Sequence, residues 1–406
     1  MSAITLNSES ITTMIDHYFN ANETNLKLGR SRISLNIEGE PGLGKTALVN
    51  QYAKSKDMEF VQLNLAQIEE LSDLIGYPIK EYKIQAKKKD SEGNVKFVSK
   101  WVPEVSVNSF VTKGWSLTNE NRMGYAQPEW IQGKTDRPGI LFLDDFTRAS
   151  QAFLQATMQL IQHGEYLSWS LPNNWMVLLS SNPDDGEHSV NSVDSAQSSR
   201  YSTYTMGYNE KAWAKWAESE GIDGRAINFL LMYREAVVVT DDQNVEKIAI
   251  NPRRWVSFFN TLVNIDNYEE NLPLIRLIGE ASVGSVGTNL FVTFINNKLD
   301  RLIAPEEILL GDTDTVVAKL KEIIGHGDTY KSSIASALST RYVNYTLMYF
   351  KDKPLSKEIA DHMEALFTNE VFGADVNYSI IHNLFNKNKT KFAKLLVKKA
   401  IVDAIN

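Results

Sequence analysis

Residues 39–46 read Gly-Glu-Pro-Gly-Leu-Gly-Lys-Thr and fit the phosphate-loop pattern G-x-x-x-x-G-K-[ST]. The glycines allow a tight turn whose backbone N–H groups point inward at phosphate oxygens. Alternation over 33–37 predicts a strand before the loop, and 45–53 reads as a helix after it, which suits anion binding at a helix N-terminus. We therefore expect nucleotide binding by Gly39, Glu40, Pro41, Gly42, Leu43, Gly44, Lys45 and Thr46.

The composition bounds the class of protein. A chain of 406 residues is too long for one ordinary core and predicts two or three domains. Apolar content of 43% and charged content of 23% are typical of soluble globular proteins. We see no apolar run long enough to span a bilayer and no signal peptide, so we expect a cytoplasmic protein without a membrane partner.

Three further features of the composition and sequence argue against particular functions. The chain has no cysteine, which excludes disulfides, a thiolate nucleophile and cysteine metal sites. The six histidines show no H-E-x-x-H or paired-ligand spacing. A net charge of −8 argues against a general nucleic-acid binder, although a local basic patch is compatible with it.

The first half of the chain alternates strand and helix patterns. Strands are predicted at 58–65, 140–143, 175–180 and 201–206, with helices between them, which indicates a parallel sheet with helices on both faces over 1–207. A lysine-rich β-hairpin is predicted at about 79–103. The stretch 104–138 reads as a long loop, and such loops are usually functional or mobile.

Helical patterns dominate after residue 208. They predict a helical second domain over 208–310 and a further helical region over 311–406. The last pattern, 376–405, carries several lysines, which we interpret as the solvated face of an amphipathic helix. The fold class expected for the whole chain is therefore α/β, followed by all-helical parts.

Polar residues end two of the predicted buried strands. Asp144 and Asp145 follow the apolar run 140–143, and Asn182 follows 175–180. Since the carboxyl ends of parallel strands meet at one edge of a sheet, these side chains are expected to lie together. Asp144 and Thr46 would hold Mg²⁺, Asp145 would polarise the attacking water, and Asn182 would contact the γ-phosphate or orient the water.

These motifs and their order resemble the AAA+ ATPases, closest to the MoxR-like branch, over roughly residues 30–265. The resemblance is carried by the phosphate loop, by 142–149 (Phe-Leu-Asp-Asp-Phe-Thr-Arg-Ala), by Ser-Asn-Pro at 181–183 and by 194–201 (Asp-Ser-Ala-Gln-Ser-Ser-Arg-Tyr). The segment 72–76 (Ser-Asp-Leu-Ile-Gly) also fits that branch, and the hairpin falls where the branch carries an insert in its second helix.

The resemblance implies a role for each matching residue. Lys45 and Thr46 match Walker A, Asp144 and Asp145 match Walker B, and Asn182 matches sensor 1. Arg200 matches the arginine finger that enters a neighbouring subunit's site. Arg253, in Pro-Arg-Arg at 252–254, matches sensor 2, although the choice between Arg253 and Arg254 stays open. Arginine suits these roles because its planar fork binds phosphate oxygens bidentately.

The chain departs from the family pattern at two places. Walker B usually ends in Asp-Glu, and the shorter side chain of Asp145 places its carboxylate farther from the water, which predicts slow hydrolysis or a switch-like ATPase. Phe-Thr-Arg at 146–148 stands where the branch favours Ile-Asn-Arg, so Arg148 is a secondary candidate for contact between subunits.

The first functional hypothesis is an ATP- and Mg²⁺-dependent ring, a hexamer by resemblance, that remodels or activates a partner protein. The family suggests a partner with a von Willebrand A-type domain. The hairpin and the segment between Trp115 and Trp130 would face that partner. Alternatives are a nucleic-acid-associated AAA+ protein of clamp-loader, helicase or restriction-GTPase type, and a slow switch or scaffold. The phosphate loop does not discriminate ATP from GTP.

Overall fold

The computed structural model describes residues 5–89, 95–133, 137–183, 195–237 and 251–392, together with 395 and 401. The chain divides into two compact units, Met1–Gly207 and Tyr208–Asn406. Each unit has hydrophobic clusters of its own, and the two are described separately below.

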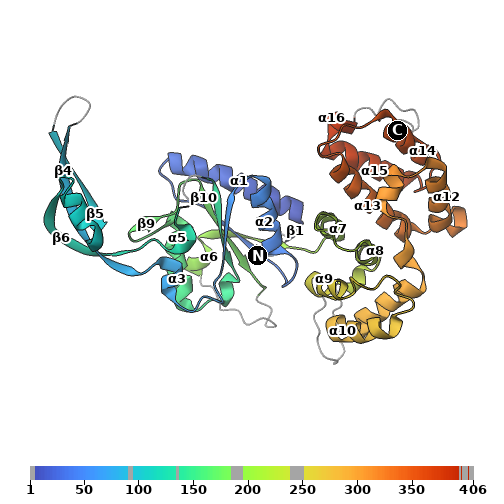
Figure 1. The fold of residues 1–406 in the computed structure, drawn as a ribbon, viewed down its shortest axis with the longest axis horizontal. Helices are drawn as coiled ribbons and strands as arrows, with labels where there is room; N and C mark the ends of the chain where they lie inside the picture. Colours follow the sequence, from blue (N-terminus) through green and yellow to red (C-terminus); the bar gives the residue numbers. More distant parts are fainter. Residues whose placement is uncertain are drawn as a thin grey trace. The chain divides into compact units, whose positions relative to one another are not determined.

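The first unit is built on a six-stranded parallel sheet, seen between the blue and green helices in Figure 1. Its central strands are almost wholly buried, as parallel strands covered on both faces must be. This confirms the α/β class. In spatial order the strands are β1 (Thr5–Leu6), β11 (Tyr201–Met206), β2 (Ser34–Glu38), β10 (Trp175–Ser181), β7 (Gly139–Asp144) and β3 (Glu59–Asn64).

Helices cover the two faces of this sheet. Along β7, Ile140 and Phe142 pack into one cluster with α1 (Ser8–Lys27) and α2 (Lys45–Ser55). Leu141 and Leu143 pack into the other cluster, with α3 (Leu71–Ile75) and α5 (Gln151–His163). Alternate residues of a strand point to opposite faces, so one apolar run supplies both layers. The helices at 45–53 and 149–162 were expected and are confirmed with slightly shifted ends.

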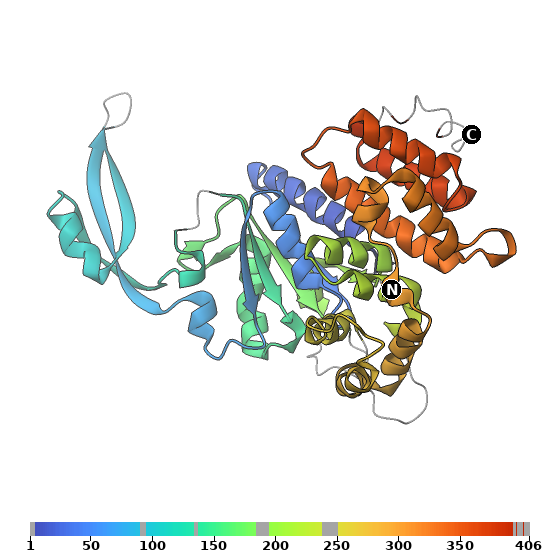
Figure 2. The same cartoon turned by 45° about the vertical axis from the view of Figure 1, so that its right-hand side comes forward.

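A second, antiparallel sheet occupies the insert, in the order β5-β4-β6 (Figure 2). The strands β4 (Pro78–Lys89) and β5 (Val95–Pro103) form the expected hairpin. The expectation of a loop over 104–138 was wrong, because β6 (Ser116–Tyr125) pairs along β4. Its sequence is mostly polar and shows little alternation, so its strand character comes from backbone pairing. Before and after it lie η1 (Glu104–Ser106), α4 (Val107–Val111) and η2 (Glu129–Ile131).

A small hairpin connects the base of the insert to the rest of the first unit. It consists of β8 (Glu165–Tyr166) and β9 (Trp169–Ser170), and the sequence did not predict it. The hydroxyl of Ser168 accepts from the N–H of Tyr125 at 2.6 Å and donates to its carbonyl at 2.9 Å. The indoles of Trp130 and Trp169 stack edge to face at 5.7 Å, and Trp130 donates to the carbonyl of Leu74. Trp130 is therefore a packing residue at this base.

The second unit is helical throughout its described part. The helical character predicted after residue 208 is confirmed there. The pattern 376–405 is broken at Asn388, and its residues 393, 394, 396–400 and 402–405 lie outside the described ranges. The elements are α7 (Glu210–Ser219), α8 (Gly224–Met232), η4 (Arg234–Ala236), α9 (Pro252–Thr261), α10 (Leu272–Asn296), η5 (Leu299–Arg301), α11 (Pro305–Leu310), α12 (Thr313–Ile324), η6 (Gly327–Thr329), α13 (Ser332–Tyr349), α14 (Lys357–Thr368), α15 (Ala374–Lys387) and α16 (Lys389–Phe392).

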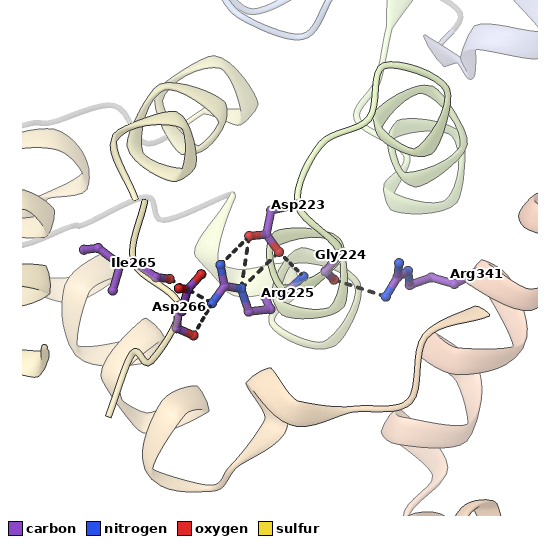
Figure 3. Close-up of polar contacts among 6 residues, drawn as sticks. All are labelled: Asp223, Gly224, Arg225, Ile265, Asp266 and Arg341. Atoms are coloured by element: carbon purple, nitrogen blue, oxygen red, sulfur yellow. Dashed lines mark hydrogen bonds and ion pairs between the residues drawn. The ribbon is translucent and has the colours of Figure 1, made fainter. Parts of the chain in front are cut away.

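Two hydrophobic clusters fill this unit, one with buried residues between 213 and 295 and one with buried residues between 303 and 401. Arg341, a buried arginine on α13, connects the cluster over 303–401 to helices of the cluster over 213–295. Arg341 Nε donates to Glu218 of α7 at 2.7 Å, and its Nη1 donates to Asn228 of α8 at 3.1 Å. The same Nη1 donates to the carbonyl of Gly224 at 3.3 Å, a contact drawn in Figure 3. The two clusters are thus tied by charge-assisted hydrogen bonds as well as by packing.

Arg225, on the same helix as Gly224, closes a second polar cluster (Figure 3). Its guanidinium pairs with Asp223 at 2.6 Å and donates to the carbonyls of Ile265 and Asp266. It also lies 3.8 Å from the ring centre of Tyr268. One side chain thereby fixes the loop after α9 to the start of α8.

The expectation that no apolar run could span a bilayer needs correction. The helix α10 has 25 residues and includes an 18-residue stretch with a mean hydropathy of 1.2. By length and composition alone, α10 is long and apolar enough to cross a membrane. In this structure 44% of that stretch is buried inside the protein. Its Ile275, Val283 and Phe291 lie in the first cluster of the second unit. Gly284, with φ 72°, interrupts its helical backbone. Packing inside this unit accounts for the apolar composition of α10.

Candidate functional site

The phosphate loop joins the end of β2 at Glu38 to the start of α2 at Lys45. Gly42 and Gly44 have φ values of 84° and 91°, in the left-handed region that favours glycine. Gly39 is required for another reason, because a Cβ there would lie 2.9 Å from the carbonyl oxygen of Met206. The glycine spacing seen in the sequence is thus explained by two backbone conformations and one close approach.

The ammonium group of Lys45 is held inside this loop, and the residue is only 8% exposed. It donates to the carbonyl oxygens of Gly39 at 2.5 Å and Glu40 at 3.3 Å, and to Asn182 Oδ1 at 3.1 Å. A buried ammonium is stable only where such acceptors surround it. Lys45 therefore brings together the loop and the end of β10, where Asn182 lies.

Asp144 ends β7 and accepts hydrogen bonds from three neighbouring elements. Its Oδ2 accepts from the Thr46 hydroxyl at 2.8 Å and from Gln62 Nε2 at 2.9 Å, and its Oδ1 accepts from the Ser180 hydroxyl. Sequence reasoning did not assign Gln62 or Ser180 to the site. Ser180 had a visible signal, its place at the end of a buried strand, whereas Gln62 is identified only by the pairing of β3 with β7.

The Thr46 hydroxyl and the Asp144 carboxylate offer oxygen ligands 2.8 Å apart beside the phosphate loop. Hard divalent cations such as Mg²⁺ prefer oxygen ligands and are usually held by one or two carboxylates together with phosphate oxygens. The residues present therefore fit a Mg²⁺–nucleotide complex.

Asp145 has an unusual backbone, with φ 51° and ψ 38°, a region that non-glycine residues seldom adopt. Its N–H donates to Asp144 Oδ1 at 3.1 Å, and its Oδ1 accepts from Asn182 Nδ2 at 3.4 Å. Asn182 thus spans Lys45 and Asp145 with its two amide atoms. The residues predicted from the ends of two strands do lie together, at the carboxyl edge of the sheet.

Arg200 lies at the opposite edge. It immediately precedes β11, which pairs in parallel with β2 so that Tyr201 is level with Ser34 and Thr205 with Glu38. Five strand steps of about 3.3 Å place it roughly 16 Å from the edge that carries the phosphate loop. Its Nε donates to Gln162 at 3.1 Å and its Nη1 to the carbonyl of Ala196 at 2.5 Å.

The other arginines that were predicted as site candidates are Arg253 and Arg254 in the second unit and Arg148 in the first. Arg253 is exposed in the first turn of α9 in the second unit, and the neighbouring Arg254 donates to the carbonyl of Ser282 at 3.2 Å. Both arginines are exposed, so the choice between them for sensor 2 stays a prediction. Arg148 is exposed at the end of η3 (Phe146–Arg148), three residues beyond Asp145. Asp194, which helped to carry the resemblance, lies outside the described ranges.

A parallel sheet, a glycine loop at the start of α2 and a hydroxyl–carboxylate pair beside it define an α/β protein of the P-loop NTPase class. No protein-family model matches the chain, and no curated protein matches it. The matches to solved structures have low sequence identity.

Three of these structures illustrate the likeness. A RuvB point mutant from Thermotoga maritima is 12% identical, with 90% of this chain and 86% of that chain covered and a TM-score of 0.35. A putative ATPase from Cytophaga hutchinsonii is 13% identical, with 97% and 89% covered and a TM-score of 0.28. NtrX from Brucella abortus, in complex with ADP, is 10% identical, with 88% and 67% covered and a TM-score of 0.34.

Proposed function

We propose that this chain is an AAA+ ATPase that binds ATP with Mg²⁺ and hydrolyses it. The observation that carries the proposal is the 2.8 Å hydrogen bond between Thr46 and Asp144, which joins the phosphate loop after β2 to the end of the buried strand β7, on the far side of β10. Two motifs about a hundred residues apart in the sequence thus meet at one point. In a glycine-rich turn that arose by chance, the Thr46 hydroxyl would not be expected to contact the Asp144 carboxylate.

Each side chain then has a defined task. The loop N–H groups and Lys45 bind phosphate oxygens, and Thr46 with Asp144 holds Mg²⁺, which would neutralise phosphate charge. Asn182 already contacts both Lys45 and Asp145, so it is suited to align the γ-phosphate with the attacking water. Asp145 is the candidate for orienting and polarising that water.

The place of Arg200 supports a site completed by assembly. An arginine about 16 Å along the sheet from its own phosphate loop cannot reach the phosphates bound there. It can serve a neighbouring molecule if copies pack with the amino edge of one sheet against the carboxyl edge of the next. Such a heterologous contact forms a ring when its rotation closes, and the family resemblance favours a hexamer of MoxR-like chaperone type.

The partner would be another protein in the cytoplasm, with a von Willebrand A-type domain as the family's suggestion. The insert β4–β6 is the candidate for contacting it, because seven large apolar residues are exposed over 95–123. They are Val95, Phe97, Val98, Val105, Val111, Leu117 and Met123.

A second candidate function is a slow ATP-dependent switch. It is favoured by Asp145, whose carboxylate is one methylene shorter than glutamate and is engaged by Asn182. Such a protein would hold ATP for long periods and change partners on rare hydrolysis. The two candidates share the same site and differ in turnover.

The deciding experiment is phosphate release from ATP with Mg²⁺ across a range of protein concentrations, with Lys45→Ala as the inactive control. Specific activity that rises with concentration supports the ring motor. Activity independent of concentration contradicts a shared site. Tight ATP binding with negligible release at every concentration favours the switch.

A further inference from the structure

The paired strands β4 and β5 of the insert form a lysine-rich ribbon in an otherwise acidic protein. Tyr82 to Lys89 and Val95 to Pro103 together contain six lysines and no acidic residue, whereas the whole chain has a net charge of −8. These lysines are Lys83, Lys87, Lys88, Lys89, Lys96 and Lys100. The charge of the ribbon is thus opposite in sign to that of the chain as a whole.

The charges at the base of the insert are balanced internally. Lys83 pairs with Glu120 at 2.9 Å, and Arg122 pairs with Glu81 at 2.8 Å. Two other lysines lie on aromatic rings, Lys87 at 5.6 Å from the ring centre of Phe97 and Lys100 at 3.7 Å from that of Phe110. A ring can hold an ammonium group in place without cancelling its charge. Lys100 is therefore positioned but keeps an external positive field.

The strand β5 is also an edge strand. The sheet order β5-β4-β6 places β4 on one side of it and no described strand on the other. All of 95–100 is exposed, including Phe97 at 65% and Val95 at 56%. A long edge with exposed apolar side chains is a template for pairing with another strand, and proteins normally block or cover such edges.

Alternation along β5 gives its two faces different chemistry. Val95 and Phe97 point to one face, and Lys96 and Lys100 point to the other, with Val98 between them. Lys87 of the next strand, β4, lies opposite Phe97. Among the side chains of β5 itself, an added strand would meet apolar groups on one face and two ammonium groups on either side of Val98 on the other. Its own side chains should then alternate between apolar and acidic.

We propose that the edge of β5 binds an extended, acidic segment of the partner protein by strand addition. The inference rests on the proposed function in one respect: the bound segment would belong to the protein that this chain remodels. A second copy of β5 is a poor occupant, because it would bring its lysines against like charges. A nucleic acid would neutralise the lysines but has no peptide groups to pair with the strand edge.

The test uses the full chain without nucleotide and a fluorescein-labelled peptide of alternating Glu and Val. Fluorescence anisotropy should show that wild type binds this peptide and that the K96E/K100E variant binds it about tenfold more weakly. The same variant should bind a peptide of alternating Lys and Val more tightly than wild type does. The matched control is K353E/K357E, which reverses two exposed lysines at the same spacing in the second unit and should bind like wild type.

A third peptide with proline at every fourth position separates strand addition from charge alone, because proline lacks the N–H group that pairs with an edge. It should bind much more weakly than the Glu and Val peptide. Equal binding of the two, or no effect of K96E/K100E, overturns the proposal. Preferential binding of a twelve-nucleotide oligo(dT) that K96E/K100E abolishes also overturns it. An inactive ATPase leaves all these measurements intact, so failure of the proposed function remains separate.

Discussion

Lys45 and Arg200 lie at opposite edges of one parallel sheet, although the strands next to them, β2 and β11, are hydrogen-bonded neighbours. Lys45 follows the carboxyl end of β2, and Arg200 precedes the amino end of β11. Parallel pairing makes this separation unavoidable, because both strands run in the same direction over their shared length. If both side chains act on one nucleotide, they must come from different molecules.

This separation predicts complementation between two inactive variants. Lys45→Ala removes phosphate binding but keeps Arg200, whereas Arg200→Ala keeps the phosphate site and should lower hydrolysis by about 10³-fold. Mixing the two should restore part of the activity, because some interfaces then pair an intact site with an intact arginine. Phosphate release from a series of mixing ratios measures this. Arg200→Ala with undiminished hydrolysis would show that the arginine finger was wrongly assigned.

Asp145 should control the rate of turnover. In Asp145→Glu the carboxylate extends one methylene farther toward the water, so we expect faster single-turnover hydrolysis, while Asp145→Asn should bind ATP and release almost no phosphate. Nucleotide affinity, measured with a fluorescent ATP analogue, should change little in both variants because Lys45 and Thr46 are untouched. A slower Asp145→Glu variant would contradict the distance argument.

Arg341 should matter for stability, since it and Glu218 are each only 9% exposed. Arg341→Met leaves the carboxylate of Glu218 buried without its partner, which costs about 3–5 kcal/mol in comparable buried pairs. Thermal and urea unfolding should show the loss. The double variant Arg341→Met/Glu218→Gln removes the charge as well and should recover a substantial part of it. If the single and double variants are equally destabilised, packing of the arginine stem is the cause.

The Asp223–Arg225 pair should make stability depend on acid pH. Burial alone raises the pKa of Asp223, but the hydrogen bonds and charge of Arg225 outweigh it and hold the pKa below the usual range. The folded state then binds the proton less readily than the unfolded state. The stabilisation is present above the unfolded pKa of about 3.9 and is lost as the pH falls through the folded pKa. The stability difference between wild type and Asp223→Asn should shrink on acidification below about pH 4.

Local patterns predicted most helices and the central strands because their signals lie within a few residues. The run 140–143 and the helix start at Lys45 are examples, confirmed by β7 and α2. The strand β6 was missed because its pairing partner, β4, lies far away in the sequence. The strands β8 and β9 were missed because each is only two residues long. Backbone pairing, which composition does not encode, decides such elements.

The site divides in the same way. The order of its motifs in the sequence predicted Lys45, Thr46, Asp144, Asp145 and Asn182 as one group, since strand ends of a parallel sheet converge. The roles of Gln62 and Ser180 as hydrogen-bond donors to Asp144 depend on which strands are neighbours, and only the tertiary structure shows that β3 and β10 flank β7.

The sequence by itself determined a phosphate loop between a strand and a helix, a parallel α/β sheet and a helical second half, because glycine spacing and apolar periodicity are local properties. Tertiary structure decided the rest. It placed Arg200 at the edge opposite Lys45, extended the hairpin to three strands with β5 at its edge, and buried Arg341 against Glu218. These relationships depend on strand order and on contacts between distant segments, which no short stretch of sequence specifies.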